Sequence, residues 1–353
     1  MSVSKNVTID QVAREAGVSI QTVSRVINNR YDVAAETRQR VQDAVIRLGY
    51  QPNAIARGLA SRRSRTLGLV THDFNDHFFT QVVTGAEEEA HRNNYFCMLG
   101  SSTCSLDEMP KYLRLLTERH VEGVLFAREG GPDELDQINR IAQDGTPAVI
   151  VGFHRDGQTF SSVDINNIDG GRRATECLLQ YGHMRIACIT GPLRTQSAQD
   201  RLSGYRLALE SAGLSYDPEI VVEGSYGNSS FGSGYRGMKR LLEVDPSITA
   251  VFAQNDRMGV GALTALQQAG LRVPEDLSMV GYDDSPEAEY SAPPLTTIRQ
   301  DTVRVGALAV QILLRHIEDN SLPPEQILLN TELVWRGSVS LPRDQIARKG
   351  GAT

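Results

Sequence analysis

The feature that most constrains the fold is a regular alternation, from Thr66 onward, of short apolar runs with helical patterns. The apolar runs are of strand length and include "TLGLVT", "VEGVLFA", "PAVIVGF", "RIACITG" and "AVFAQND". Segments such as "HFFTQVVTGAEEEAHRN" and "MGVGALTALQQAG" lie between them, which is typical of a doubly wound parallel sheet with helices on both faces. The number of runs predicts two such sheets, with "PEAEYSAPPLTTIRQD" as a crossover between them.

The beginning of the chain has a different pattern, that of three short helices. The stretches are "TIDQVAREAG", "SIQTVSRVIN" and "AAETRQRVQDAVIRLG". Thr8 and Ser19 are expected N-caps, Gly17 is placed where the chain must turn, and Gly49 is placed where the third helix must end. The sequence therefore predicts a small all-α head in front of an α/β body, because 353 residues are too many for a single core.

Charge divides the chain at the same place. The whole chain carries a formal net charge of -7, but residues 1–65 have eleven Lys and Arg against five Asp and Glu. A basic segment suits a polyanion, because each phosphate that it neutralises releases a counterion. The head is therefore expected to bind nucleic acid, and the acidic body is not.

The second helix of the head carries the residue types that read base edges. In a helix-turn-helix the second helix enters the major groove, where glutamine pairs with adenine and arginine with guanine. The candidate DNA contacts on this helix are Ile20, Gln21, Thr22, Ser24, Arg25 and Asn28. The alternative is an ordinary solvated helix face, and the basic segment "ARGLASRRSR" that follows favours the DNA-binding interpretation.

The stretches "VTIDQVAREAGVSIQTVSRVIN" and "GYQPNAIARGLASRRSRTLGLV" resemble the LacI/GalR family of bacterial transcription regulators. The resemblance implies a hinge helix that folds on the operator, with Asn53 and Arg57 among its DNA contacts and Leu59 as a wedge in the minor groove. Gly58 departs from the serine common before this leucine. A glycine there weakens the hinge helix by roughly 0.5 to 1 kcal/mol relative to alanine.

The resemblance extends to the body, where motifs such as "GYDDSP" and "PLTTIRQD" are similar to the effector domain of that family. It implies a fold like that of periplasmic sugar-binding proteins, with a ligand held between two lobes at the carboxyl ends of the strands. The implied effector contacts are Asn75, Phe79, Ser197, Arg201, Asn255, Asp283 and Gln300. The aromatic candidates for stacking on a sugar are Phe78, Phe79, Tyr226 and Phe231, with core packing as the alternative for each of them.

Two departures from the family pattern concern the effector. Many relatives place an aspartate near the position of Gly152, so one polar contact is missing or moved here. The loop "SYGNSSFGSGY" is longer than usual, so the sequence leaves open whether Tyr226 or Phe231 faces the ligand. Of two neighbouring candidates, we expect Asp283 to contact the ligand and Asp256 to be structural.

The implied organisation has four parts. Residues 1–50 form the helix-turn-helix domain, 51–65 the hinge helix and linker, 66–343 the effector-binding and dimerisation domain, and 344–353 a tail. Within the body, the first lobe is expected to take residues 66–165 and 296–324, and the second lobe 166–295 and 325–343. The partners implied are a palindromic double-stranded DNA operator, a small-molecule effector and a second copy of the chain.

The expected function is a repressor of carbohydrate-utilisation genes that a sugar releases from its operator. A purine corepressor is the alternative effector, and a solute-binding receptor without DNA regulation is a second alternative. No GxSxG, HExxH or Walker motif is present and the seven histidines lack ligand spacing, so we expect no enzyme, no metal and no cofactor. The four cysteines form no CxxC pair and no signal peptide or membrane span is visible, so a cytoplasmic protein is expected.

Overall fold

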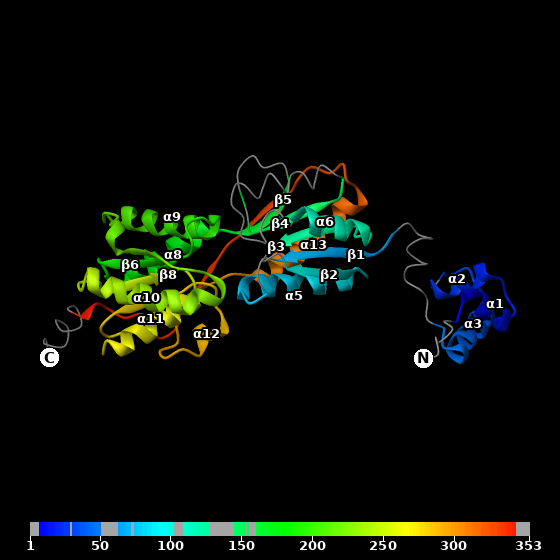
Figure 1. Cartoon of the computed structure of the whole chain (residues 1–353), viewed down its shortest axis with the longest axis horizontal. Helices are drawn as coiled ribbons and strands as arrows, with labels where there is room; N and C mark the ends of the chain where they lie inside the picture. Colours follow the sequence, from blue (N-terminus) through cyan, green and yellow to red (C-terminus); the bar gives the residue numbers. More distant parts are fainter. Residues whose placement is uncertain are drawn as a thin grey trace. The chain divides into compact units, whose positions relative to one another are not determined.

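The structure is a computed structural model that describes residues 7–28, 30–50, 63–71, 74–101, 109–127, 145–152, 154 and 160–343. The chain forms two compact units, Met1–Arg65 and Thr66–Thr353 (Figure 1). The division agrees with the change in charge and pattern at this point of the sequence. Asn53, Arg57 and Leu59 lie outside the described residues.

The head contains the three predicted helices: α1 (Ile9–Ala16), α2 (Ile20–Ile27) and α3 (Ala35–Leu48). The predicted caps are confirmed. Thr8 forms a capping box with Gln11, and the Ser19 hydroxyl accepts from the Thr22 amide at 3.1 Å. The core of the head is a buried cluster of small apolar side chains: Val12, Ala13, Ala16, Val23, Val26, Val41 and Ala44. This core fixes which face of α2 remains outside.

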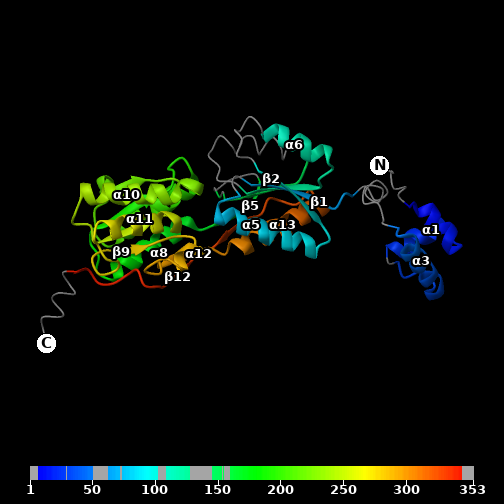
Figure 2. The same ribbon diagram turned by 60° about the horizontal axis from the view of Figure 1, so that its bottom comes forward.

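The first lobe of the body is built on a six-stranded parallel sheet with strand order β11-β5-β4-β3-β1-β2. Its strands are β1 (Thr66–Thr71), β2 (Phe96–Ser101), β3 (Gly123–Ala127), β4 (Ala148–Val151), β5 (Ser161–Ile165) and β11 (Gln326–Leu329). Helices α5 (His77–Arg92) and α13 (Thr302–Glu318) cover one face, and α6 (Met109–Glu118) covers the other (Figures 1 and 2). The inner strands β1, β3, β4 and β5 are buried on both faces, as their continuous apolar runs predict, whereas the edge strands β2 and β11 are partly exposed.

The second lobe is built on a four-stranded parallel sheet with strand order β7-β6-β8-β9. Its strands are β6 (Ile186–Thr190), β7 (Val221–Glu223), β8 (Ala250–Ala253) and β9 (Ser278–Val280). One face packs against α8 (Asn167–Gln180) and α9 (Gln196–Ser211), the other against α10 (Ser230–Val244) and α11 (Asp256–Gln268). The short elements are η2 (Pro218–Ile220), η3 (Gly227–Ser229) and α12 (Pro286–Glu289). Two doubly wound lobes are therefore confirmed.

The expected boundary between the lobes is wrong at two places. β11 was expected in the second lobe, but it pairs in parallel with β5 of the first sheet. β10 (Thr297–Arg299) was expected in the first lobe, but it pairs antiparallel with β12 (Glu332–Val334). Both strands are short, and β11 is an edge strand with only Leu329 buried, so its sequence does not indicate the sheet to which it belongs. The chain therefore passes between the lobes after β5, and it does so again in the segments after β10 and before β12.

Close helix packing in the second lobe brings α8 against α9 beside the cleft described below. A side-chain carbon at Gly171 of α8 would overlap the backbone of Arg201 on α9, and one at Gly204 would overlap the carbonyl of Ile168. The two glycines therefore allow the helix backbones to approach closely. This packing sets the position of Arg201 beside the cleft.

Candidate functional site

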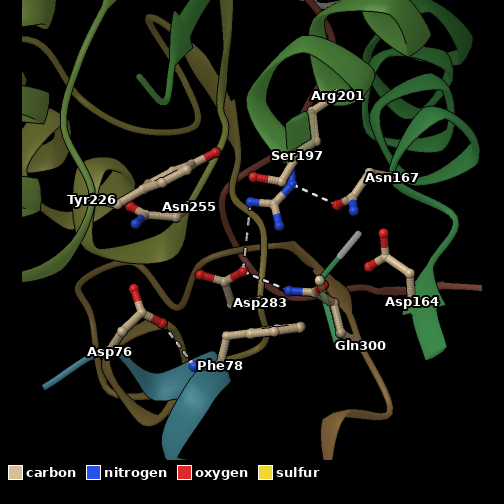
Figure 3. A pocket seen from close by; sticks show the side chains of 11 residues that line it. Asp76, Phe78, Asp164, Asn167, Ser197, Arg201, Tyr226, Asn255, Asp283 and Gln300 are labelled. Atoms are coloured by element: carbon tan, nitrogen blue, oxygen red, sulfur yellow. Dashed lines mark hydrogen bonds and ion pairs between the residues drawn. The ribbon is translucent and has the colours of Figure 1, made fainter. Parts of the chain in front are cut away.

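A polar cleft lies where the carboxyl ends of the two sheets meet, the place at which open α/β sheets bind ligands. Figure 3 shows the side chains that converge there from both lobes. The cleft is lined by Asp76, Phe78, Gly152, Asp164, Asn167, Ser197, Arg201, Tyr226, Asn255, Asp283 and Gln300. Five of the seven predicted effector residues are among them: Ser197, Arg201, Asn255, Asp283 and Gln300.

Arg201 is buried and held in a single orientation. Its Nε donates to Asn167 Oδ1 at 2.8 Å, and its Nη1 donates to the carbonyl oxygen of Gln254 at 2.6 Å. The guanidinium also lies 3.8 Å from the centre of the Tyr282 ring, a cation–π contact. Because these contacts fix the guanidinium, Arg201 presents a preorganised cation at the centre of the cleft.

Asp283 and Gln300 form a pair beside this guanidinium. The amide nitrogen of Gln300 donates to Asp283 Oδ1 at 2.7 Å, and the same oxygen lies 3.8 Å from Arg201 Nη1. Asp283 has φ +115°, a backbone conformation that few non-glycine residues adopt and that concentrates at functional sites. Gln300 Oε1 is buried and receives no hydrogen bond from the described residues, so it is available as an acceptor.

The neighbouring carboxylates Asp284 and Asp256 have a different role, that of fixing the backbone around the cleft. Asp284 pairs with Arg299 at 2.6 Å and with Arg336 at 2.5 Å. Asp256 accepts from the Thr297 hydroxyl at 2.6 Å, and burial raises the pKa of its carboxyl to about 7. These contacts are in keeping with the structural role expected for Asp256.

Asn255 is both a lining residue and a helix cap. Its Oδ1 accepts from the Met258 amide at 2.8 Å, which caps α11, and its Nδ2 donates to the Ser230 hydroxyl at 3.3 Å. The side-chain oxygen is thus used to cap the first turn of the helix that follows β8. The rest of the side chain lies on the wall of the cleft.

Two predicted effector residues do not line the cleft. Phe79 is only 2% exposed and packs in the core of the first lobe, whereas the adjacent Phe78 lines the cleft. Side chains of adjacent residues in a helix point in directions about 100° apart. In α5 this places Phe79 on the face that packs against the sheet. Asn75 instead offers its backbone carbonyl to Arg257 Nη1 at 2.7 Å. Tyr226, left open in the sequence, lines the cleft, and Phe231 is not among the lining residues.

Three lining residues were missed: Asp76, Asp164 and Asn167. Asp76 is the N-cap of α5 and accepts from the Phe78 amide at 2.9 Å. Asn167 accepts from both Arg201 and Tyr282. Asp164 lies inside β5 and is 4% exposed, and burial raises the pKa of its carboxyl to about 7. The available signal was a charged residue within the otherwise apolar and small strand "SSVDI".

The head presents the predicted base-reading face. Ile20, Gln21, Arg25 and Asn28 are exposed on α2, while Thr22 and Ser24 are partly buried. Arg25 Nη1 lies 3.5 Å from Asp32 Oδ2. The Thr22 hydroxyl contacts the Ser19 hydroxyl at 2.9 Å, and Asn28 Nδ2 donates to the Ser24 carbonyl at 2.8 Å. The exposed side chains can reach a groove, whereas Thr22 contacts the start of the helix and Ser24 its end.

Within the described residues, no group of three or more His, Cys, Asp or Glu side chains is arranged to hold a metal ion. In the same part of the chain, no helix is long and apolar enough to cross a membrane. Asp283 and Asp284, adjacent in sequence, have different partners, so they do not form an acid and base pair.

Comparison with known proteins identifies both parts of the chain. Residues 8–53 match the family described as bacterial regulatory proteins, lacI family, and residues 175–339 match a periplasmic binding protein-like domain. The HTH-type transcriptional repressor PurR of Aliivibrio fischeri (strain ATCC 700601 / ES114) is 38% identical over 338 residues, 94% of this chain and 98% of the relative.

Two solved structures have the same arrangement of elements. The complex of the transcriptional regulator CelR with cellobiose is 36% identical, with a TM-score of 0.72, covering 94% of this chain and 100% of that one. The lac repressor dimer bound to operator and the anti-inducer ONPF is 31% identical, with a TM-score of 0.86, covering 95% and 100%. The chain therefore belongs to the LacI family of bacterial DNA-binding transcriptional regulators.

Proposed function

We infer that this regulator is a repressor of carbohydrate-utilisation genes and that a neutral sugar releases it from its operator. The observation that carries the proposal is the charge balance of the cleft. Among the described residues that line it, three carboxylates, those of Asp76, Asp164 and Asp283, accompany one guanidinium, that of Arg201. Carboxylates accept hydrogen bonds from hydroxyl groups, and an excess of them repels an anionic ligand.

The positions of these groups favour a polyhydroxylated ligand. Figure 3 shows Asp76, Asp283 and Asp164 at separate places around the cleft, with the rings of Phe78 and Tyr226 also on its walls. A sugar carries hydroxyls that point in several directions and has apolar faces that stack on aromatic rings. The solved complex of the CelR relative with cellobiose is an example of a protein of this family with such a ligand.

A purine is the alternative, and the PurR relatives are the observation that favours it. A purine base has its polar groups in the plane of one ring system, so it pairs with groups at its edge. Acceptors that approach from several sides of the cleft suit it less well. Sugars and purine bases are both neutral, so the cleft can distinguish them only by the positions of their polar groups.

On the DNA side, the proposal assigns base contacts to the exposed residues of α2. Arg25 would donate to guanine and Gln21 would pair with adenine, with Ile20 against a thymine methyl. From the family resemblance, Asn53, Arg57 and Leu59 would contact the minor groove in the hinge. A homodimer formed through residues 66–343 would match the two-fold symmetry of a palindromic operator.

The experiment is a thermal-unfolding panel on the full-length protein with ribose, glucose, cellobiose, glucose 6-phosphate, hypoxanthine and guanine. A ligand at 100 times its Kd stabilises the native state by about 2.7 kcal/mol, which shifts the transition measurably. The expected result is a shift with a neutral sugar and none with glucose 6-phosphate. Asp283→Asn should remove the shift, whereas Asp217→Asn, on the surface of the second lobe, should keep it. A shift with a purine alone contradicts the proposal.

A further inference from the structure

Asp164 has an unusual position for a charged residue. It lies within β5, and the residues on both sides of it, Val163 and Ile165, point into the core that α5 and α13 cover. Because side chains alternate along a strand, Asp164 points away from this core. It is 4% exposed and lines the cleft, and Figure 3 shows its carboxylate directed toward the space beside Asn167 and Gln300.

The carboxylate of Asp164 is incompletely satisfied by the protein. Among the described residues, the one hydrogen bond that it receives comes from the Ile165 amide to Oδ1, at 2.7 Å. None of the arginine or lysine side chains in that part of the chain forms an ion pair with it. A buried carboxylate oxygen without a donor is costly, and such groups in native structures call for a further partner. Oδ2 therefore remains as an acceptor that faces the cleft.

Gln300 extends the same acceptor surface. Its amide nitrogen is occupied by Asp283, and its Oε1 is buried without a donor among the described residues. Asn167 Oδ1, next to Asp164, already accepts from Arg201 and Tyr282. This end of the cleft thus offers oxygen acceptors and requires donors from a ligand.

The neighbouring strand explains why the acceptor comes from Asp164. Val151 of β4 lies opposite Val163 of β5, so the residues that follow them, Gly152 and Asp164, are neighbours at the strand ends. Gly152 lines the cleft but has no side chain. Asp164 thus brings a carboxylate to the cleft wall next to a position that has no side chain.

Three other titratable or charged groups lie within electrostatic range of Asp164. Burial is the main cause of its raised pKa of about 7, and the carboxylate of Asp200 on α9 raises it further, whereas Arg201 lowers it. The Tyr282 hydroxyl also lies within electrostatic range. A hydroxyl that donates to Asp164 stabilises its ionised form, and a phosphate in the same place is repelled.

We propose that Asp164 is the residue that selects the effector at this end of the cleft, by accepting a hydrogen bond from a ligand hydroxyl and by excluding phosphorylated sugars. This assignment rests on the proposed function and adds the ligand class: an unphosphorylated sugar with a hydroxyl donor directed at β5. Asp164 would then set both the affinity for the neutral sugar and the ratio of this affinity to that for the phosphorylated sugar.

The test is calorimetric titration of the full-length protein with ribose, glucose, cellobiose, ribose 5-phosphate and glucose 6-phosphate. Asp164→Asn keeps the shape of the side chain and one acceptor but removes the charge. It should lower the affinity for the neutral sugar about tenfold and reduce the preference over its phosphate by a similar factor. Asp200→Asn is the matched control, because Asp200 bonds to Gln196 and does not line the cleft. It should change the affinity less than twofold.

A pH series on the wild type gives a readout that does not depend on how the variant folds. If the ionised carboxylate binds the hydroxyl, affinity for the neutral sugar should rise about tenfold from pH 6 to pH 8. Unchanged affinity in Asp164→Asn, or a wild-type affinity independent of pH over this range, overturns the assignment and leaves the proposed function standing. Binding of only a purine or a phosphorylated sugar by the wild type overturns both.

Discussion

Arg257 of the second lobe donates from Nη1 to the backbone carbonyl of Asn75 in the first lobe, at 2.7 Å. Its Nε also donates to Glu287 at 3.0 Å, which holds the guanidinium in place from its own lobe. The contact lies next to Asp76, which lines the cleft. Arg257 therefore connects the two lobes beside the ligand site, and it stabilises the arrangement in which the cleft groups converge.

Arg257→Gln should weaken the effector response. A hydrogen bond from a charged group is worth about 1.5 to 3 kcal/mol, less at a partly exposed site, so the effector concentration needed for half-maximal operator release should rise about fivefold. Operator affinity without effector should change little. Arg272→Gln removes an exposed ion pair with Asp276 in the same lobe and serves as the control. An unchanged dose response in Arg257→Gln contradicts the role of the contact.

Asp164 makes stability depend on pH. Burial raises the pKa of its carboxyl from 3.8 to about 7 in the folded protein, so the folded state retains a proton that the unfolded state has released. This stabilising contribution is complete below about pH 4 and is lost as the pH rises through about 7.

Asp164→Asn should therefore have a flatter profile of unfolding free energy between pH 4 and 8 than the wild type, and a relative gain in stability at the alkaline end. Asp256, whose pKa is also raised to about 7, should keep part of the slope in both proteins. Urea titrations across this range measure the slopes. Parallel profiles for the two proteins would contradict the expectation.

Arg201→Ala should abolish the effector response and also destabilise the second lobe. The substitution removes the donors to Asn167 and to the Gln254 carbonyl, and it leaves a cavity against Tyr282. Buried charged networks of this kind cost several kcal/mol when one partner is removed. DNA binding should survive at low temperature, because the head is a separate compact unit. Retention of a normal ligand-induced thermal shift in the variant would refute this prediction.

Arg25→Ala should reduce base specificity more than general DNA affinity. Loss of a bidentate contact to guanine costs about 1 to 3 kcal/mol on the matched site alone. Arg14→Ala is the control, since Arg14 is an exposed cation on α1 that pairs with Asp10 and does not belong to the base-reading face. Fluorescence anisotropy on matched and scrambled duplexes measures the ratio. Equal weakening on both duplexes would show that Arg25 contacts only the phosphate backbone.

Features determined by neighbours in sequence were predictable from the sequence. The caps at Thr8 and Ser19 and the left-handed Gly17 follow from local hydrogen bonding and from glycine conformation, and the structure contains all three. The two parallel sheets follow from apolar runs that are buried on both faces. Five of the cleft residues followed from the family resemblance, and they lie at the strand ends, where open α/β sheets bind ligands.

Features determined by long-range packing were not predictable. β11 takes its position by pairing with the edge of β5. The sequence of β11 does not indicate this pairing, because only one of its four residues is buried. Phe78 and Phe79 are adjacent in the sequence, and only the contact of α5 with the sheet decides which of them is buried. Asp164 was missed because its place on the cleft wall depends on how β5 lies beside β4, a long-range contact that the local sequence does not indicate.

Release of a labelled operator by a neutral sugar is the decisive measurement, with the operator selected in vitro on the full-length protein and the sugar identified in the thermal panel. Our expectation is that the fluorescence anisotropy of the protein–DNA complex falls as the sugar is added, and that hypoxanthine and glucose 6-phosphate leave it unchanged. An anisotropy that rises with hypoxanthine or guanine, and does not respond to any neutral sugar, would contradict it.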